Sequence, residues 1–175
     1  MKTLIIISVI VALSYVAGVV WKKKELPESL SAMVFELKGK WKWLWTAWMW
    51  AVTFTIGIPT IEALPESVKF LGFLMMACLT FVGAMPLFEN ENKKEHYFFA
   101  IIGGVLSQLC VAFICPWWLF TWLAFVALLV KLVCDYYKER NDMVLVEHWY
   151  DYIGCFLSEV ICYIALVGAV VTKLS

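Results

Sequence analysis

Long apolar runs, separated by short polar stretches, dominate this chain. The runs cover about residues 3–21, 43–61, 69–88, 97–115, 117–134 and 149–172. Each is close to the roughly 20 residues that a helix needs to cross a bilayer about 30 Å thick. We therefore predict an all-α polytopic integral membrane protein. It has six transmembrane helices in a compact bundle and a single domain over residues 1–175.

The fourth and fifth runs meet at "ICPWWLF" without a polar spacer. Proline is tolerated in the first turn of a helix but disrupts a helix interior. One uninterrupted helix across both runs would also be too long for any bilayer. Pro116 therefore predicts a tight turn between two helices.

Composition supports the membrane assignment and narrows the function. Hydrophobic residues make up 63% of the chain, against about 45–50% in soluble domains. Six spans leave no room for a separate soluble domain, so a function must lie in the bundle or its loops. The formal net charge is zero, which argues against nucleic acid as a partner. The six cysteines lie singly in apolar stretches and indicate small buried residues.

Lysine and arginine positions predict the orientation. The first, third and fifth loops and their borders carry eleven of these residues: Lys22, Lys23, Lys24, Lys38, Lys40, Lys42, Lys93, Lys94, Lys131, Lys138 and Arg140. The opposite side carries three: Lys2, Lys69 and Lys173. Cytoplasmic loops are enriched in basic residues. We therefore expect a plasma or inner membrane protein with both termini on the outer side. The signal-like start is interpreted as a retained first span, because lysines follow it directly.

Tryptophans gather where the predicted spans begin and end. They are Trp21, Trp41, Trp43 and Trp45 around the first loop, and Trp117 and Trp118 at the fifth span. Their half-polar rings favour the headgroup level. The first loop also reads "LSAMVFELKGKW", with apolar residues at helical spacing. This predicts an amphipathic helix over about residues 28–41, lying on the inner leaflet and held by apolar burial and anionic lipid.

The sixth span carries the most unusual residue, Glu159. An ionisable group near the centre of a bilayer is costly and calls for an explanation. Helical periodicity places it on one polar ridge with four other residues, which are Glu147, His148, Asp151 and Ser158. Such a ridge predicts a proton or ligand pathway. The alternative is a neutral Glu159 hydrogen-bonded to a neighbouring helix, for instance to Thr53, Ser107 or Gln108. Glu147 and His148 are equally consistent with ordinary interfacial residues.

Three further polar residues predict contacts between helices. Ser107 and Gln108 follow the small residues of the fourth span, where helices can approach closely. Lys131, near the cytoplasmic end of the fifth span, would reach Asp151 on an adjacent antiparallel helix. Snorkelling of Lys131 to the headgroups is the alternative.

Catalytic and metal motifs are weak or missing. The sequence has no HExxH, GxSxG, P-loop or GxGxxG motif. We expect no cofactor and no metal. His96 and His148 are the only histidines, and they could share a zinc site only if the fourth and sixth spans adjoin.

Three functions remain open. The first is a proton-linked transporter or channel-like protein that uses Glu159. The second is a membrane-embedded enzyme that acts on lipid, with His96 and His148 at the cytoplasmic face. The third is a non-catalytic assembly or partner protein. Expected partners are membrane lipids and either a second copy of the chain or another membrane protein.

Overall fold

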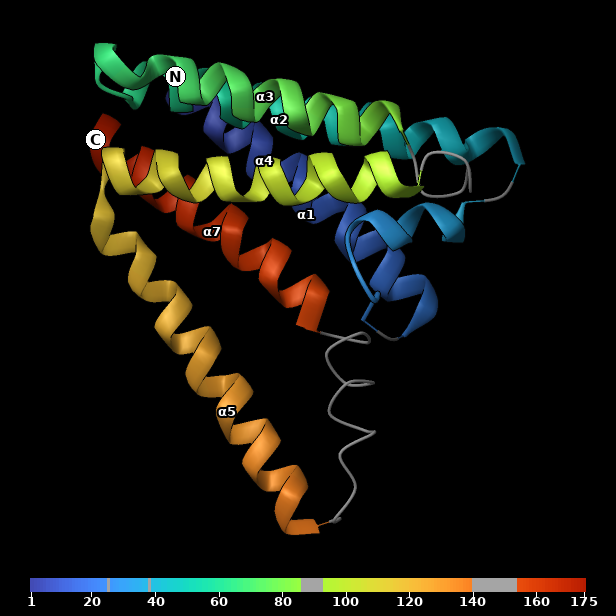
Figure 1. Ribbon diagram of the computed structural model, residues 1–175. Helices are drawn as coiled ribbons and strands as arrows, with labels where there is room; N and C mark the ends of the chain where they lie inside the picture. Colours follow the sequence, from blue (N-terminus) through green and yellow to red (C-terminus); the bar gives the residue numbers. More distant parts are fainter. Residues whose placement is uncertain (25, 38, 86–92, 140–153) are drawn as a thin grey trace.

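The computed structural model describes residues 1–24, 26–37, 39–85, 93–139 and 154–175, and these contain helices and turns but no strand (Figure 1). The α-helices are α1 Lys2–Lys23, α2 Trp43–Ala63, α3 Lys69–Ala84, α4 Lys93–Ile114, α5 Thr121–Glu139 and α7 Cys155–Leu174. The predicted all-α class is confirmed over the described residues, which contain six α-helices. Residues 86–88 of the third predicted span and 149–153 of the sixth lie outside the described residues.

Within the described part of the chain, five helical segments are long and apolar enough to cross a membrane. They are Lys2–Lys23, Trp43–Ala63, Glu66–Ala84, Lys93–Ile114 and Cys155–Leu174. Together they suggest an integral membrane protein with several spans. Membrane crossing by the fifth predicted span, 117–134, stays a prediction, because its apolar helical part, Pro116–Ala127, is shorter.

Pro116 ends one helix and begins another. α4 stops at Ile114, and the 3₁₀ helix η5 Pro116–Phe120 leads into α5. Cys115 between them has an extended backbone, with φ −158° and ψ 89°. A proline lacks the N–H that would continue the hydrogen-bond ladder of α4. The predicted turn at this position is confirmed.

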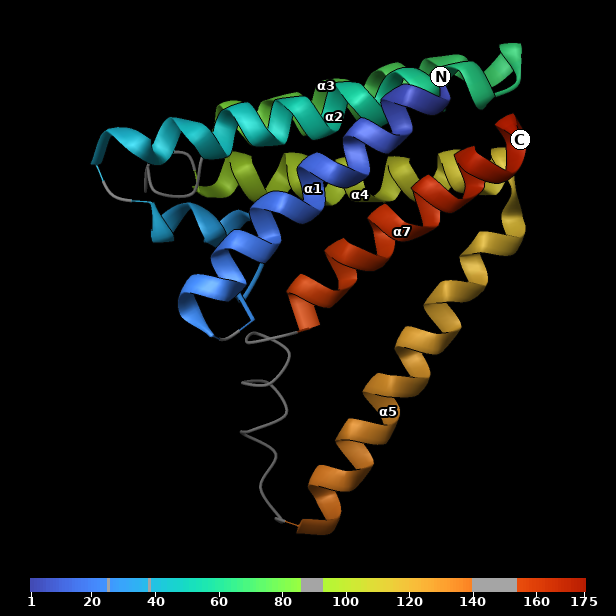
Figure 2. The ribbon, with the colours of Figure 1, turned by 180° about the vertical axis from the view of Figure 1, so that it is seen from behind.

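α2, α3 and α4 lie side by side, and α1 and α7 cross them at an angle (Figures 1 and 2). α3 packs between α2 and α4, while α1 packs mainly on α2 and α7 mainly on α4. α5 contacts the bundle through its first turns, where Phe125 is buried, and then diverges from it in both views. The other helices form the body that positions the candidate site.

Both termini lie at the same end of the bundle, beside the turn between α2 and α3 (Figure 1). This turn contains the short 3₁₀ helix η3 Glu66–Val68. The loop between α1 and α2 lies at the opposite end. α1 therefore runs away from the end that holds the termini, and α7 runs back to it.

The first loop differs from its prediction. Residues 28–41 do not form one α-helix; they contain two 3₁₀ helices, η1 Ser31–Glu36 and η2, which begins at Gly39 and ends at Lys42. Met33 and Val34 are fully buried in the protein, at 0% exposed. These two apolar side chains of the predicted membrane-facing stripe face protein instead, whereas Trp41 of the same stripe is 54% exposed. The prediction of a continuous amphipathic helix is therefore wrong.

Candidate functional site

Glu159 lies four residues after Cys155, the first residue of α7, and its side chain is half-buried. Its Oε2 accepts a hydrogen bond from the backbone N–H of Leu30, at 2.6 Å. Leu30 belongs to the first loop, so the bond joins segments 129 residues apart in sequence. An ionised carboxylate makes such a bond short and strong. The costly acid of the sixth predicted span thus has a specific partner in the loop.

The same loop segment receives further hydrogen bonds from the bundle. The backbone N–H of Phe156 in α7 donates to the carbonyl of Glu28 at 3.1 Å. The indole N–H of Trp45 in α2 donates to the carbonyl of Leu30 at 3.2 Å. Within the loop, Ser29 Oγ accepts from the N–H of Ala32 at 2.9 Å. Buried backbone groups outside a regular helix need such partners, and in a membrane the need is stricter.

His96, in the first turns of α4, holds the next residue of the segment. Its ring is only 1% exposed, and Nε2 lies 2.9 Å from Ser31 Oγ. Nδ1 lies 2.6 Å from the carbonyl oxygen of Met85, just after α3. A carbonyl can only accept, so Nδ1 carries a proton. In the neutral ring, Nε2 then accepts from the Ser31 hydroxyl.

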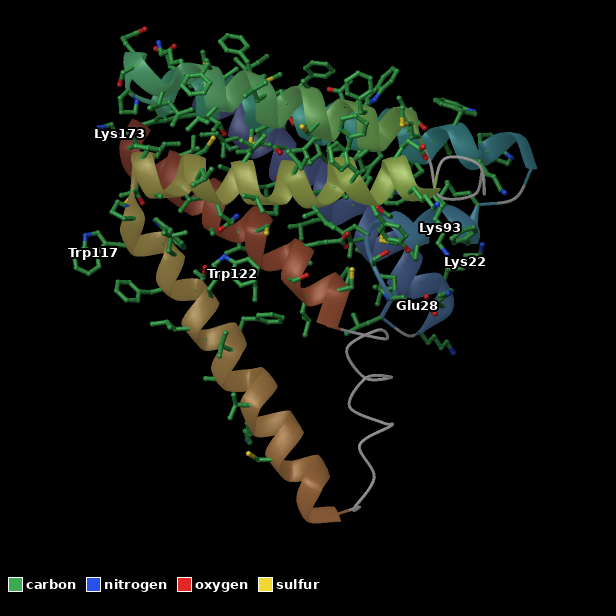
Figure 3. The ribbon with its side chains drawn as sticks, in the orientation of Figure 1. Lys22, Glu28, Lys93, Trp117, Trp122 and Lys173 are labelled. Carbon is green, nitrogen blue, oxygen red and sulfur yellow. The ribbon has the colours of Figure 1, made fainter. Side chains whose placement is uncertain are left out.

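Apolar packing completes the docking of the segment. Val34 lies in a buried cluster with Trp45, Trp48 and Val82. Trp45 itself is 0% exposed. Figure 3 shows the segment around Glu28 beside the described start of α7. Hydrogen bonds from the helices and apolar burial therefore both hold the same short stretch. We call residues 27–37 the docked segment.

A second polar cluster ties three helices together near the middle of α4. Gln108 Nε2 donates to the carbonyl of Cys162 in α7 at 3.2 Å and to Ser107 Oγ at 3.0 Å. Its Oε1 accepts from the indole N–H of Trp122 in α5 at 2.9 Å. Ser107 donates to the carbonyl of Gly104 at 2.7 Å. One amide side chain thus connects α4 with both α5 and α7.

Ser158 is the one remaining ridge residue that the structure describes, so the predicted pathway stays a prediction. Ser158 donates to the carbonyl of Cys155 in its own helix, at 2.7 Å. Glu147, His148 and Asp151 lie outside the described residues. The Lys131–Asp151 pair is therefore not tested, and the Lys131 side chain is exposed.

The alternative partners named for Glu159 were wrong. Ser107 and Gln108 use their polar atoms within the cluster around α4. The hydroxyl of Thr53 is buried without a hydrogen-bond partner in the described part of the chain. The partner is a backbone N–H, and a sequence pattern does not reveal backbone donors. The polar side chains on either side of Leu30 have other partners: Ser29 Oγ bonds the N–H of Ala32, and Ser31 Oγ bonds His96.

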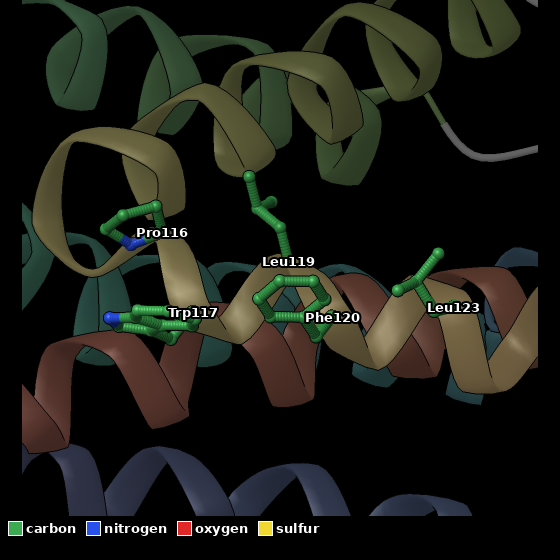
Figure 4. Close-up of a pocket in the computed structure, with 5 residues that line it drawn as sticks. All are labelled: Pro116, Trp117, Leu119, Phe120 and Leu123. Carbon is green, nitrogen blue, oxygen red and sulfur yellow. The ribbon is translucent and has the colours of Figure 1, made fainter.

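The described residues contain no group of three metal-ligating side chains, and His148 lies outside them. A pocket of about 460 Å³ lies elsewhere, on η5 and the start of α5 (Figure 4). Its lining is Pro116, Trp117, Leu119, Phe120 and Leu123. This apolar surface lacks the polar groups that usually orient a ligand.

Comparison of the chain with protein-family models, with curated proteins and with solved structures found no match.

Proposed function

We propose that this protein is a small transporter or channel-like membrane protein in which Glu159 exchanges protons. The observation that supports this most is the hydrogen bond from Leu30 N–H to the Glu159 carboxyl group. It joins an ionisable group in a candidate span to a loop of turn and 3₁₀ backbone that is folded against the α-helices. Non-helical backbone at membrane depth and intramembrane acids both recur in transport pathways.

Proton exchange on Glu159 would be coupled to the docked segment. An ionised carboxylate only accepts hydrogen bonds. A protonated carboxyl group is also a donor, and its O–H needs an acceptor. The two forms therefore hold the Leu30 N–H with different strength, and by linkage the segment position affects proton binding. A proton-linked transporter requires such coupling between proton binding and the position of a protein segment.

The test is Glu159→Gln in proteoliposomes that contain a pH-sensitive dye. Glutamine keeps an oxygen that accepts from Leu30 N–H but cannot exchange a proton near neutral pH. We expect proton flux under a pH gradient to fall at least about tenfold, as for loss of a general acid–base group. Glu62→Gln is the matched control, because Glu62 is exposed near the far end of α2. Absent flux in the native protein, or equal flux in Glu159→Gln, would contradict the proposal.

A second candidate is a lipid-acting enzyme with Ser31 as nucleophile. It is favoured by the 2.9 Å contact between Ser31 Oγ and His96 Nε2, with the ring oriented by the Met85 carbonyl. A hydroxyl, a base and an orienting group in this order are typical of nucleophilic catalysis. Ser31 Oγ would attack the carbonyl carbon of a lipid ester and pass its proton to Nε2. The alcohol would leave with that proton, and water would release the acyl group. Ser31 is only 7% exposed, which ranks this candidate second.

Covalent labelling distinguishes this candidate. A fluorophosphonate probe should modify Ser31 of the purified protein, and Ser31→Ala or His96→Gln should abolish the label. Ser29→Ala, in the same loop, should keep it. An unlabelled native protein excludes the serine mechanism. Failure of both the flux and the labelling tests would favour the non-catalytic assembly role.

A further inference from the structure

We propose that residues 27–37, the docked segment, form a gate at this end of the bundle that Glu159 and His96 hold closed. This deepens the proposed transport function and rests on it in one respect: opening would expose Glu159 to water. The inference itself follows from how the segment is attached to the bundle.

The backbone hydrogen bonds of the segment are local, because its residues Ser31–Glu36 form the 3₁₀ helix η1. The N–H of Met33 reaches the carbonyl of Leu30 at 3.3 Å, and the N–H of Leu37 reaches that of Val34 at 3.1 Å. Ser29 Oγ and the N–H of Ala32 form a further local bond, whereas the contacts to the bundle come from side chains and backbone of α2, α4 and α7. Movement of the segment therefore breaks contacts to the bundle without unwinding an α-helix. An element held in this way can move as a unit.

Two side chains from different helices hydrogen-bond adjacent residues of the docked segment, and we call these two hydrogen bonds the latches. Glu159 of α7 holds the N–H of Leu30, and His96 of α4 holds the hydroxyl of Ser31. The first is a hydrogen bond to a carboxyl group, and the second joins side chains that are both buried. Either helix can therefore influence the same point of the loop. This convergence distinguishes the segment from a loop that merely fills space.

The side of the docked segment that packs on the bundle contains a residue, Val34, whose exposure can report opening of the gate. Val34 is 0% exposed and lies in the cluster with Trp45 and Trp48. In an open gate this side chain would leave the cluster and meet solvent. Cysteine is close to valine in size, so Val34→Cys should fit the closed state. Reaction of the introduced thiol with a membrane-impermeant maleimide would then measure opening.

The experiment compares labelling at position 34 in the full chain, reconstituted in nanodiscs. Peptide mass spectrometry separates this site from the six native cysteines. In the otherwise native protein we expect slow labelling. Glu159→Ala and His96→Ala should each raise the rate about tenfold or more, as expected when a hydrogen bond to a charged or buried group is lost. Glu159→Gln, which keeps an acceptor, should stay nearer to the native rate.

Tyr163→Phe is the matched control. Tyr163 Oη and Ser8 Oγ lie 2.7 Å apart and join α7 to α1. Removal of this hydroxyl loosens a helix contact without touching either latch, so position 34 should label at the native rate. Native-rate labelling in Glu159→Ala and His96→Ala would overturn the gate. An equal rise in Tyr163→Phe would also overturn it, because that result indicates general loosening.

The outcome is separable from that of the flux test. Faster labelling without any proton flux would establish the gate and reject transport. Loss of flux in Glu159→Gln without latch-dependent labelling would establish transport through Glu159 and reject the gate. Monodisperse elution of every variant confirms that the fold is retained.

Discussion

At the scale of single residues, polar side chains in this protein mainly join segments. Indole N–H groups show the pattern: Trp48 donates to the carbonyl of Val11, and Trp50 to that of Thr80, each at 3.0 Å. An unpaired donor is costly in hydrocarbon, so a tryptophan inside the bundle must find an acceptor. Trp45 was expected at the headgroup level but is fully buried and bonded to the docked segment. Trp21, 87% exposed, remains available for the interface.

Substitution of Gly168, with Gly104 as its control, tests how tightly one helix position is packed. A Cβ added at Gly168 in α7 would lie 2.5 Å from three atoms of the Trp118 ring. The rigid indole also donates to Thr172 Oγ1 at 3.0 Å, so its displacement would break that bond. We expect Gly168→Ala to lower the free energy of unfolding by about 1–3 kcal/mol, as overpacking does. Thermal unfolding in detergent would measure it.

Gly104 is the control for this substitution. A Cβ at Gly104 meets nothing within 4 Å, and alanine favours a helix over glycine by about 0.5–1 kcal/mol. Gly104→Ala should therefore leave stability unchanged or slightly higher. Equal losses in both variants would contradict the packing of Trp118 on α7.

At the scale of elements, the helices follow from local rules. Apolar length predicts α1, α2, α3, α4 and α7 because backbone groups in a bilayer must pair within their own segment. Pro116 predicts a helix end because its ring removes a donor. These rules depend only on residues that are close in sequence. The sequence alone is therefore sufficient to predict these helices and this helix end.

The fold of the docked segment cannot be predicted from such local rules. Residues 28–41 have an apolar spacing that fits a helix on a lipid surface. The spacing does not reveal whether lipid or protein covers the apolar side chains. Contacts from 15, 65 and 129 residues away decide the outcome, through Trp45, His96 and Glu159. The partner of Glu159 was unpredictable for the same reason.

At the scale of the molecule, helix arrangement and charge lead to one topology. Lys2 and Lys173 lie at the ends of the chain, which share one end of the bundle. Lys22 and Lys93 lie at the other end, beside the docked segment (Figure 3). The end with more basic residues is expected to face the cytoplasm. We therefore propose that the gate opens toward the cytoplasm and that both termini lie outside.

Cysteine substitution in intact cells tests this orientation. Lys2, Lys93 and Lys173 are exposed in the structure, so each can be replaced without loss of a buried contact. An impermeant maleimide should label Lys2→Cys and Lys173→Cys directly, and Lys93→Cys only after permeabilisation, because basic flanks resist translocation. The reverse pattern would leave the bundle intact and reject the charge argument. Different behaviour of Lys2→Cys and Lys173→Cys would instead contradict the bundle, because the shared end of the two termini requires them to meet the same solution.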